Sequence, residues 1–573
     1  MSERRIGVYI CYCGGNISDY VDCERIREAI KDEKDVAIAK TAMFTCSDAA
    51  QQEIVDDIQE EELDALVIAS CSPTLHRFTF RGVAKRAGLN PYQYIQVNLR
   101  EQCSWAHTDN LEYATEKAIL MVKAGIAKAR YTEPLEEIRI DTVGKVLVVG
   151  AGISGLRAAL ALSDLGLDVF LSEKTGSLGG WVAKFGRMYP HDRSGKDIIK
   201  SLVDEAKQRQ NITVYTNAEI VEKQGCVGNF DVKLRIKNEG EIPLNVGSII
   251  VCTGFESCEP ANGEFAYGNE GVLTLPEFKE LLDNCNGKLK YKGREVKSIA
   301  YIYCVGSRED ASKKDARTYC SRYCCNAATH ASLLAQDISP GVHQFHLYRD
   351  LRTYGKYELL YEKARKEGAL FIKFNDEEPP QIEKDNGSFK LKVKDVLTAG
   401  EELELETELV VLVTGMVPRH NDALNDVLKL PVGLDGFFKE IHPKLRPVET
   451  VIDGISIAGT CQSPRNSSES VSSALAAVAK SASLLMKGYV ELEPLIARLT
   501  KDTVAWDEEF VKVCPYSAIE RVETDDREIT EINQALCKGC GGCVPFCPDN
   551  TIEIRGYRDR QIKAMIKAMA RET

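Results

Sequence analysis

The 573-residue sequence lacks any apolar run of the roughly 18 residues that a membrane-spanning helix requires. Its first residues, MSERRIGVYICYCGG, lack the apolar segment of a secretory signal peptide. It also lacks a surplus of positive charge: the formal net charge is −13, whereas nucleic-acid-binding surfaces are basic. We therefore expect a cytoplasmic protein with no membrane span and no nucleic-acid partner.

Cysteine is abundant, with 20 residues in the chain. A reducing cytoplasm argues against a disulfide framework, so metal binding or redox chemistry is the better interpretation wherever the spacing supports it. The cysteines without such spacing are interpreted as small buried apolar side chains. These are Cys23, Cys226, Cys252, Cys258 and Cys285.

The order of apolar and helical patterns divides the chain into three predicted domains. Residues 1–135 alternate short apolar runs with helical patterns, which indicates parallel βαβ units. Residues 136–490 open with a strand and a glycine-rich turn and close with a helix rich in alanine and serine. Residues 491–573 form a short, cysteine-dense segment that ends in a basic amphipathic helix.

The glycine-rich turn indicates a dinucleotide site. The strand KVLVV leads into Gly150-Ala151-Gly152-Ile153-Ser154-Gly155, and the helical pattern LRAALALSDLG follows. Gly150 makes the tight turn, Gly152 lets the backbone approach a pyrophosphate, and Gly155 lets helix and strand pack closely. The strand DVFLSE ends at Glu173, about 20 residues downstream, where an acid binds ribose hydroxyls.

Four further segments resemble flavoproteins of the thioredoxin-reductase kind, and the first of them favours FAD over NAD. EKTGSLGGW, with Lys174, Gly180 and Trp181, resembles the loop that follows the ribose-binding acid. IIVCTGF, with Gly254, and LVVLVTGMVP resemble the strand-then-TG segments. GISIAGTCQSP resembles the second flavin contact, although Gly459 is followed by Thr460 where those proteins usually have aspartate.

The same domain lacks the second glycine-rich fingerprint that such reductases use for NAD(P)H. The expected strand is present as VKSIAYIYC, but the turn after it reads CVGSR. Four cysteines with the spacing C-x15-C-x3-C-C fall where the nicotinamide cofactor should dock: Cys304, Cys320, Cys324 and Cys325. They are candidate ligands of one iron–sulfur cluster. The alternative is one or two buried thiols beside a lost site.

Residues 537–548 read CKGCGGCVPFCP, the bacterial ferredoxin run C-x2-C-x2-C-x3-C-P. In two-cluster ferredoxins the fourth cysteine of a run ligates the other cluster, so one ligand is expected from the earlier segment VCPYSAIE. That segment retains Cys514 but has Val504, Asp507 and Phe510 where three more cysteines would stand. The spacing predicts one cluster, held by Cys514, Cys537, Cys540 and Cys543. The rival ligand set replaces Cys514 by Cys547, which is otherwise a bystander.

Five cysteines of the first domain form a less regular group. Cys11 and Cys71 each end a predicted strand, and the carboxyl ends of parallel strands line one crevice. These thiols are candidates to surround a ligand, a substrate sulfur or a third cluster; the alternative is a docking domain without a cofactor. The group is Cys11, Cys13, Cys46, Cys71 and Cys103.

Segments spread over nearly the whole chain resemble the A subunit of heterodisulfide reductase. They are CYCGGNI, ASCSP, REQCSW, GAGISG, CVGSR with YCSRYCC, YRDLRTYGK, IAGTCQSP and CKGCGGC. The resemblance implies FAD and 4Fe-4S clusters within a hetero-oligomeric complex that contains a homodimer, and flavin-based bifurcation in some members. It also implies a place near the flavin ring for Lys356, the one catalytic candidate.

The sequence departs from the longest members of that family, which carry an inserted ferredoxin domain. No cysteine run stands between residues 211 and 250, so we expect the short form with two clusters. The fold expected is α/β: a small N-terminal α/β domain, a two-dinucleotide-binding flavoprotein domain and a C-terminal ferredoxin-like α+β domain.

The function expected is that of an electron-transfer subunit that passes electrons between FAD and the clusters. The alternatives are membership of a quinone-interacting, sulfur-oxidising or aromatic-acid-reductase complex, and a free-standing flavin disulfide reductase. The last would need a C-x-x-C motif that the flavin domain lacks.

Overall fold

The computed structural model describes residues 4–285, 287–501, 508–523, 528–547 and 551–570. The chain divides into two compact units: unit 1 is Met1–Arg139 with Glu491–Thr573, and unit 2 is Ile140–Val490. The short strands β5 (Ile138–Asp141) and β28 (Tyr489–Leu492) stand at the boundaries between these segments. Unit 1 thus contains the first and the last of the three predicted domains.

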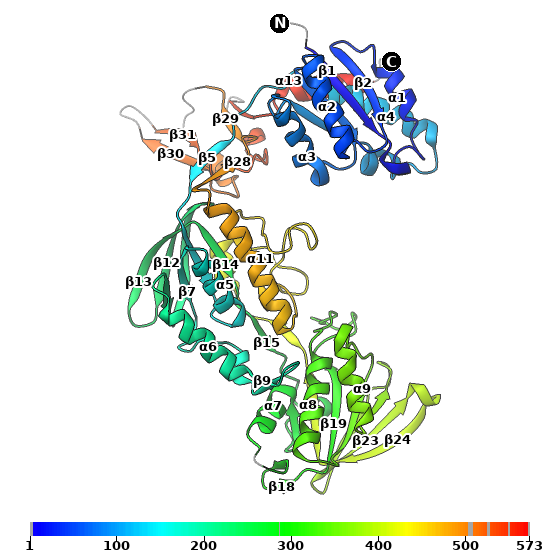
Figure 1. Cartoon of the computed structure of the whole chain (residues 1–573), viewed down its shortest axis with the longest axis vertical. Coiled ribbons are helices and arrows are strands. Elements are labelled where there is room, and N and C mark those ends of the chain that lie inside the picture. The colour runs from blue at the N-terminus through cyan, green and yellow to red at the C-terminus, as the bar shows by residue number, and fades with distance from the viewer. Residues whose placement is uncertain (1–3, 286, 502–507, 524–527, 548–550, 571–573) are drawn as a thin grey trace. The chain divides into compact units, whose positions relative to one another are not determined.

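The N-terminal part of unit 1 is a four-stranded parallel sheet in the order β2-β1-β3-β4 (Figure 1). Its central strands are buried along their whole length, as expected for a parallel sheet covered on both faces. Helices α1 and α4 pack on one face, and α2 and α3 on the other. The bounds are β1 Ile6–Cys11, α1 Cys23–Ile30, β2 Val36–Ala42, α2 Asp48–Glu60, β3 Ala65–Ser70, α3 Pro73–Arg86, β4 Tyr94–Asn98 and α4 Leu111–Ala129.

The C-terminal part of unit 1 is a small α+β structure. Two antiparallel pairs, β29 (Ala497–Leu499) with β32 (Ile552–Ile554) and β30 (Ile519–Glu523) with β31 (Glu528–Ile532), enclose a core that includes Phe510 of α12 (Glu508–Lys512). Val504 and Asp507, the other positions of the lost cysteines, lie outside the described residues. Helix α13 (Asp559–Met569) packs against α4 of the N-terminal part.

Unit 2 is built from two halves of the same design, which confirms the predicted α/β fold class. The first half has a parallel sheet in the order β10-β7-β6-β14-β27 and an antiparallel sheet β11-β12-β13 (Figure 1). Its elements are β6 Lys145–Val149, α5 Ile153–Asp164, β7 Asp168–Ser172, β8 Arg187–Met188, β9 Arg193–Ser194, α6 Gly195–Gln208, β10 Ile212–Tyr215, β11 Ala218–Cys226, β12 Asn229–Ile236, β13 Gly240–Val246, β14 Ser248–Val251, β27 Ile455–Ile457 and α11 Ser467–Leu485.

The second half repeats this plan with a parallel sheet in the order β16-β25-β19-β20-β21 and an antiparallel sheet β22-β23-β24. The antiparallel pair β15 (Phe255–Ser257) and β26 (Met416–Pro418) joins segments that lead from one half to the other. The other elements are β16 Val272–Thr274, α7 Leu275–Asp283, β17 Lys290–Tyr291, β18 Arg294–Glu295, β19 Ser298–Val305, α8 Cys324–Ile338, β20 His343–Tyr348, α9 Glu358–Lys366, β21 Leu370–Lys373, β22 Gln381–Asp385, β23 Ser388–Asp395, β24 Glu401–Thr407 and β25 Leu409–Thr414. Helix α10 (Asp422–Leu428) follows β26 and packs against β11 of the first half.

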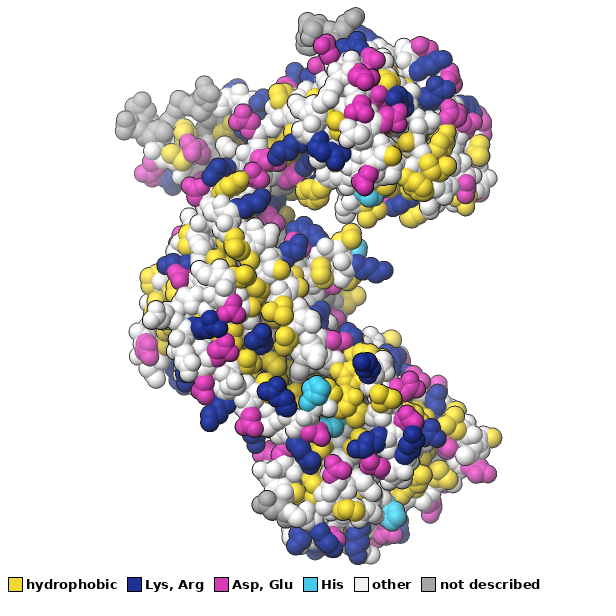
Figure 2. Space-filling model, viewed as in Figure 1, with side chains coloured by type: hydrophobic (Ala, Val, Ile, Leu, Met, Phe, Trp, Pro, Cys, Tyr) yellow, Lys and Arg dark blue, Asp and Glu magenta, His cyan; other side chains and the backbone are white. Residues whose placement is uncertain are grey.

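The surface carries charges of both signs. Acidic and basic side chains are interspersed over the face drawn in Figure 2. Within the part of the chain that the structure describes, no helix has both the length and the apolar character needed to cross a membrane. Of the cysteines interpreted as buried, Cys23, Cys252 and Cys258 are buried, whereas Cys226 and Cys285 are partly exposed.

Candidate functional site

The glycine-rich turn lies at the carboxyl end of the first parallel sheet, between β6 and α5. Gly150 has a φ of 99°, in the left-handed region that favours glycine. A Cβ atom on Gly155 would lie 1.8 Å from the carbonyl oxygen of Gly150, so helix and strand approach too closely for any side chain. A Cβ atom on Gly152 would meet nothing within 4 Å. The backbone at Gly152 therefore faces open space in which a pyrophosphate fits.

Glu173 follows β7 and is fixed beside this turn by its own hydrogen bonds. The backbone N–H of Ala151 donates to its Oε2 at 3.0 Å, and that of Thr175 donates to its Oε1 at 2.9 Å. Both carboxylate oxygens are thus oriented by backbone groups. The carboxylate stands at the cavity described next, where it can accept hydrogen bonds from ribose hydroxyls.

A cavity of about 710 Å³ extends from the glycine-rich turn to residues of the second half of unit 2. The predicted residues that line it are Gly150, Gly152, Ile153, Ser154, Glu173, Gly180, Trp181, Gly254 and Thr460. The volume is in the range of cofactor sites. The indole Nε1 of Trp181 donates to the carbonyl of Phe255 at 3.0 Å, and the two rings stack with centroids 5.6 Å apart. The cavity therefore has a flat aromatic wall that suits a planar ring.

Four other predicted residues are placed differently. Gly155 is buried in α5, and Gly459 packs so closely on Ser154 that a Cβ atom would lie 2.4 Å from its Oγ. Lys174 is exposed and pairs with Glu219 at 2.7 Å. Lys356, in the 3-10 helix Gly355–Tyr357, is exposed and does not line the cavity, although its neighbour Tyr357 does. A role for Lys356 at the flavin stays a prediction.

One face of α8 contributes lining residues that sequence reasoning did not identify. Asn326 and His330, one helical turn apart, both line the cavity. His330 is buried, and its Nε2 lies 2.9 Å from Asp192 Oδ1; burial lowers the pKa of this imidazole. Asn326 is 7% exposed, and neither atom of its amide has a hydrogen-bond partner within the protein. Asn326 follows the cysteine pair directly and His330 comes four residues later, and this one-turn spacing is the sequence signal that could have identified them.

Replacing Asn326 by leucine should stabilise the flavin-free protein and weaken flavin binding. A buried amide without partners costs about 1–3 kcal/mol, so its removal should raise the free energy of unfolding by about 1 kcal/mol. Denaturant titration of the flavin-free protein and FAD titration measure the two effects. Asn211→Leu is the matched control, because the Asn211 amide donates to Ser163 and Leu167 carbonyls and its loss should destabilise. Destabilisation by Asn326→Leu would contradict this assignment.

The cysteines of the second half gather where α8 begins. Cys304 is the last residue but one of β19, and Cys324 and Cys325 are the first residues of α8. The hydrogen bond with Cys325, burial and the nearby thiols of Cys304 and Cys320 all raise the pKa of Cys324, so the four sulfurs influence one another. Among the described residues, no three His, Cys, Asp or Glu side chains are placed to hold a single metal ion. A cluster is held instead by thiolates on separate iron atoms.

Positive charge and N–H donors lie beside three of these four sulfurs. The guanidinium of Arg308 lies 4.0 Å from Cys304 Sγ, and the backbone N–H groups of Arg322 and Arg352 donate to Cys320 and Cys325 at 3.3 and 3.5 Å. Such donors stabilise thiolates and tune the potential of a cluster. The donor set therefore fits an iron–sulfur cluster.

The C-terminal cysteines separate into two environments. Cys514, Cys537, Cys540 and Cys543 line one small cavity. Backbone N–H groups of Ala518 and Ala497 donate to the sulfurs of Cys514 and Cys537 at 3.3 and 3.4 Å. Cys547 is buried in the adjacent core, with its sulfur 3.1 Å from Thr551 Oγ1, and does not line that cavity.

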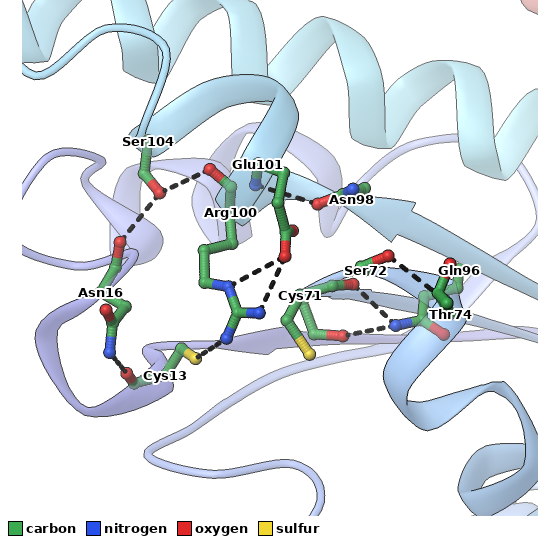
Figure 3. Close-up of polar contacts among 11 residues, drawn as sticks. Cys13, Asn16, Cys71, Ser72, Thr74, Gln96, Asn98, Arg100, Glu101 and Ser104 are labelled. Carbon is green, nitrogen blue, oxygen red and sulfur yellow. Dashed lines mark hydrogen bonds and ion pairs between the residues drawn. The ribbon is translucent and has the colours of Figure 1, made fainter. Parts of the chain in front are cut away.

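Four of the five N-terminal cysteines come together at the carboxyl end of their sheet. Burial raises the pKa of Cys71 to about 11, with further effects from Arg100, Cys13 and Cys11, and Cys11 also acts on Cys46. Figure 3 shows Arg100 donating to the sulfur of Cys13, at 3.7 Å, with Cys71 nearby. The fifth, Cys103, is instead buried against α4, where its thiol donates to the carbonyl of Ala114 at 3.0 Å.

The chain matches family models, solved structures and curated relatives. The pyridine nucleotide-disulphide oxidoreductase family matches residues 22–262, and the LdpA Fe-S cluster-binding domain matches residues 509–558. A solved thioredoxin reductase from T. acidophilum is 17% identical, covers 60% of this chain and 99% of its own, and has a TM-score of 0.41.

Curated relatives match over nearly the full length. The iron-sulfur A subunit 2 of CoB–CoM heterodisulfide reductase from Methanopyrus kandleri is 36% identical over 92% of each chain. The corresponding A subunit of Methanocaldococcus jannaschii is 32% identical over 98% of each chain. The A subunit of the H2:CoB-CoM heterodisulfide,ferredoxin reductase of Methanothermobacter marburgensis is 33% identical over 100% of this chain and 98% of its own. By this similarity over nearly its whole length, the chain belongs to the family of heterodisulfide reductase A subunits.

Proposed function

We propose that this chain is the flavin-bearing electron-transfer subunit of a hetero-oligomeric oxidoreductase, with FAD in the 710 Å³ cavity and a 4Fe-4S cluster on Cys304, Cys320, Cys324 and Cys325. The observation that carries the proposal is the continuity of the two sites. Tyr323 and Asn326 line the cavity, and they flank the cysteine pair in the sequence. Electrons therefore have a short path between the cavity and the four sulfurs.

The residues around the cavity bind and orient the cofactor. Gly152 offers open backbone to the pyrophosphate, the N-terminus of α5 supplies free N–H groups, and Glu173 accepts from the ribose. Trp181 and Phe255 provide an apolar wall, and the unpaired amide of Asn326 can bond to a polar edge of the ring. Bound FAD supplies exchange of one or two electrons, which lets two-electron donors serve one-electron clusters.

The C-terminal segment is the proposed exit to a partner. Its four cavity-lining cysteines are the proposed ligands of the second cluster, and Cys540 alone of the 20 cysteines is exposed. An exposed ligand brings a cluster close to the protein surface, where a partner's redox centre can approach. Two clusters are proposed in all; the four gathered N-terminal thiols are the place for a third if the iron content exceeds that of two clusters.

The quaternary setting is also part of the proposal. Relatives are named as subunits of heterodisulfide reductases, one of them a reductase of both heterodisulfide and ferredoxin. We propose a cytoplasmic complex in which two copies of this chain assemble with catalytic subunits that carry the disulfide chemistry. Because the sequence of the flavin domain lacks a C-x-x-C motif, we expect this chain to act through those partners.

NAD(P)H should not bleach the flavin of the isolated holoprotein, because cysteines occupy the place of the nicotinamide fingerprint. Reduced methyl viologen, a one-electron donor, should bleach it, because the clusters accept single electrons. Anaerobic stopped-flow absorbance follows the flavin with each donor. The double variant with Cys324→Ser and Cys325→Ser should be reduced more slowly by viologen than the parent. Rapid bleaching by NAD(P)H in the absence of partners would refute the proposed electron path.

A further inference from the structure

A second pocket lies within unit 1, where α3, α4 and the edge strand β4 meet the segment that leads into α13. Its volume is about 150 Å³. Its charged lining comes from Arg77 and Arg81 of α3, Lys128 of α4, and Glu133 and Arg558 of the connecting segments. None of the cysteines or flavin-site residues described above lines it.

Lys128 is the unusual member of this lining. The residue is 7% exposed, yet no hydrogen bond or ion pair to its ammonium group is found among the described residues. Its Nζ lies 3.5 Å from the centroid of the Tyr557 ring, which satisfies only one side of the cation. Burial lowers the pKa of this ammonium to about 8. Lysine is almost never this buried unless it is paired, so a partner of opposite charge is missing.

The pocket lining holds three arginines, and not all of them are matched by a carboxylate. Arg77 has no ion-pair partner among the described residues. Arg81 pairs with Glu493 at 2.5 Å, although Arg81 Nε and Glu493 Oε2 have no hydrogen-bond partner. Arg558 pairs with Glu133 at 2.5 Å, and Arg560 binds the same carboxylate. Glu133 is the acidic residue of the lining and is already shared by two arginines. The described lining therefore leaves no carboxylate to neutralise Lys128.

We propose that this pocket binds a small oxyanion, the phosphate or carboxylate group of a low-molecular-weight ligand, between Lys128, Arg77 and Arg81. Arginine forks and a lysine are the usual partners of both groups. The volume excludes a whole nucleotide or other drug-sized molecule, which needs several hundred Å³. The lining also includes Tyr557 and Arg558, which precede α13. A bound anion would therefore contact both this segment and helices α3 and α4 of the N-terminal part of unit 1.

Isothermal titration calorimetry of the full-length holoprotein tests the site, with sodium phosphate and sodium acetate as separate probes at constant ionic strength. Binding of phosphate alone identifies a phosphate site, binding of acetate alone a carboxylate site, and binding of both a general oxyanion site. Lys128→Met should weaken the bound anion by about tenfold or more, the loss of one buried charge pair. The variant should melt no lower than the parent, because it removes a charge that burial disfavours.

Lys123→Met is the matched control. Lys123 lies on the same helix, pairs with Glu33 at 2.7 Å and does not line the pocket, so its variant should bind the anion like the parent. Arg77→Ala provides a second test at an exposed residue and should weaken binding severalfold. No heat from either anion, or equal binding by the parent and both pocket variants, would overturn the proposal.

Discussion

Replacing Cys514 by alanine should abolish the C-terminal cluster, whereas replacing Cys547 by alanine should leave it intact. Cys514 lines one cavity with Cys537, Cys540 and Cys543, and Cys547 lies in the adjacent core. A 4Fe-4S cluster uses one cysteine for each iron, so the Cys514 variant should lose about four iron atoms and one reduced-cluster EPR signal.

The two variants control for each other. Both remove a sulfur from the same small segment, so a general loss of folding would affect them alike. Cys547→Ala removes a buried thiol that touches Thr551, so a modest loss of stability without loss of iron is expected there. Loss of iron from the Cys547 variant and its retention in the Cys514 variant would establish the rival ligand set.

Gly152→Ala should weaken FAD binding by about 10- to 100-fold, which corresponds to the loss of one or two charge-assisted hydrogen bonds. Gly152 has a φ of −75° and a ψ of −173°, which alanine adopts without strain, and no protein atom lies within 4 Å of the added Cβ. The folded protein therefore tolerates the methyl group, and only the pyrophosphate meets it. FAD titration followed by flavin fluorescence gives the affinity.

Gly144→Ala is the matched control for that experiment. Gly144 precedes β6 at the opposite end from the turn, and its added Cβ would make only an ordinary 3.9 Å contact with Leu167. Its FAD affinity should equal that of the parent. Unchanged affinity in the Gly152 variant would place the cofactor's phosphates elsewhere.

Sequence alone could predict those parts of the site whose function depends on the conformation of a short stretch of backbone. Gly155 is required because the carbonyl oxygen of Gly150, five residues earlier, leaves no room for a side chain, and Gly150 is favoured by its own positive φ. Such local constraints leave a motif in the sequence. The spacing of Cys514 from the 537–548 run is likewise a regularity of ferredoxin hairpins. These features lie within short stretches of chain.

The remaining features depend on tertiary packing. Asn326 and His330 face the cavity only because α8 of the second half of unit 2 packs toward the first half, and only their one-turn spacing after the cysteine pair marks them in the sequence. In the sequence, Lys128 is an ordinary lysine near the end of a helical pattern. It is buried in the structure because Tyr557, more than 400 positions away, lies against its ammonium group. Lys356 illustrates the reverse case, in which a motif indicated a site and the side chain is exposed.

The most direct test of the proposed electron-transfer role is the content of flavin, iron and acid-labile sulfide in protein purified without exposure to oxygen. We expect about one FAD and about eight iron and eight sulfide per chain, or about twelve of each if the N-terminal thiols hold a third cluster. Flavin without iron or sulfide, after oxygen has been carefully excluded, would contradict that role.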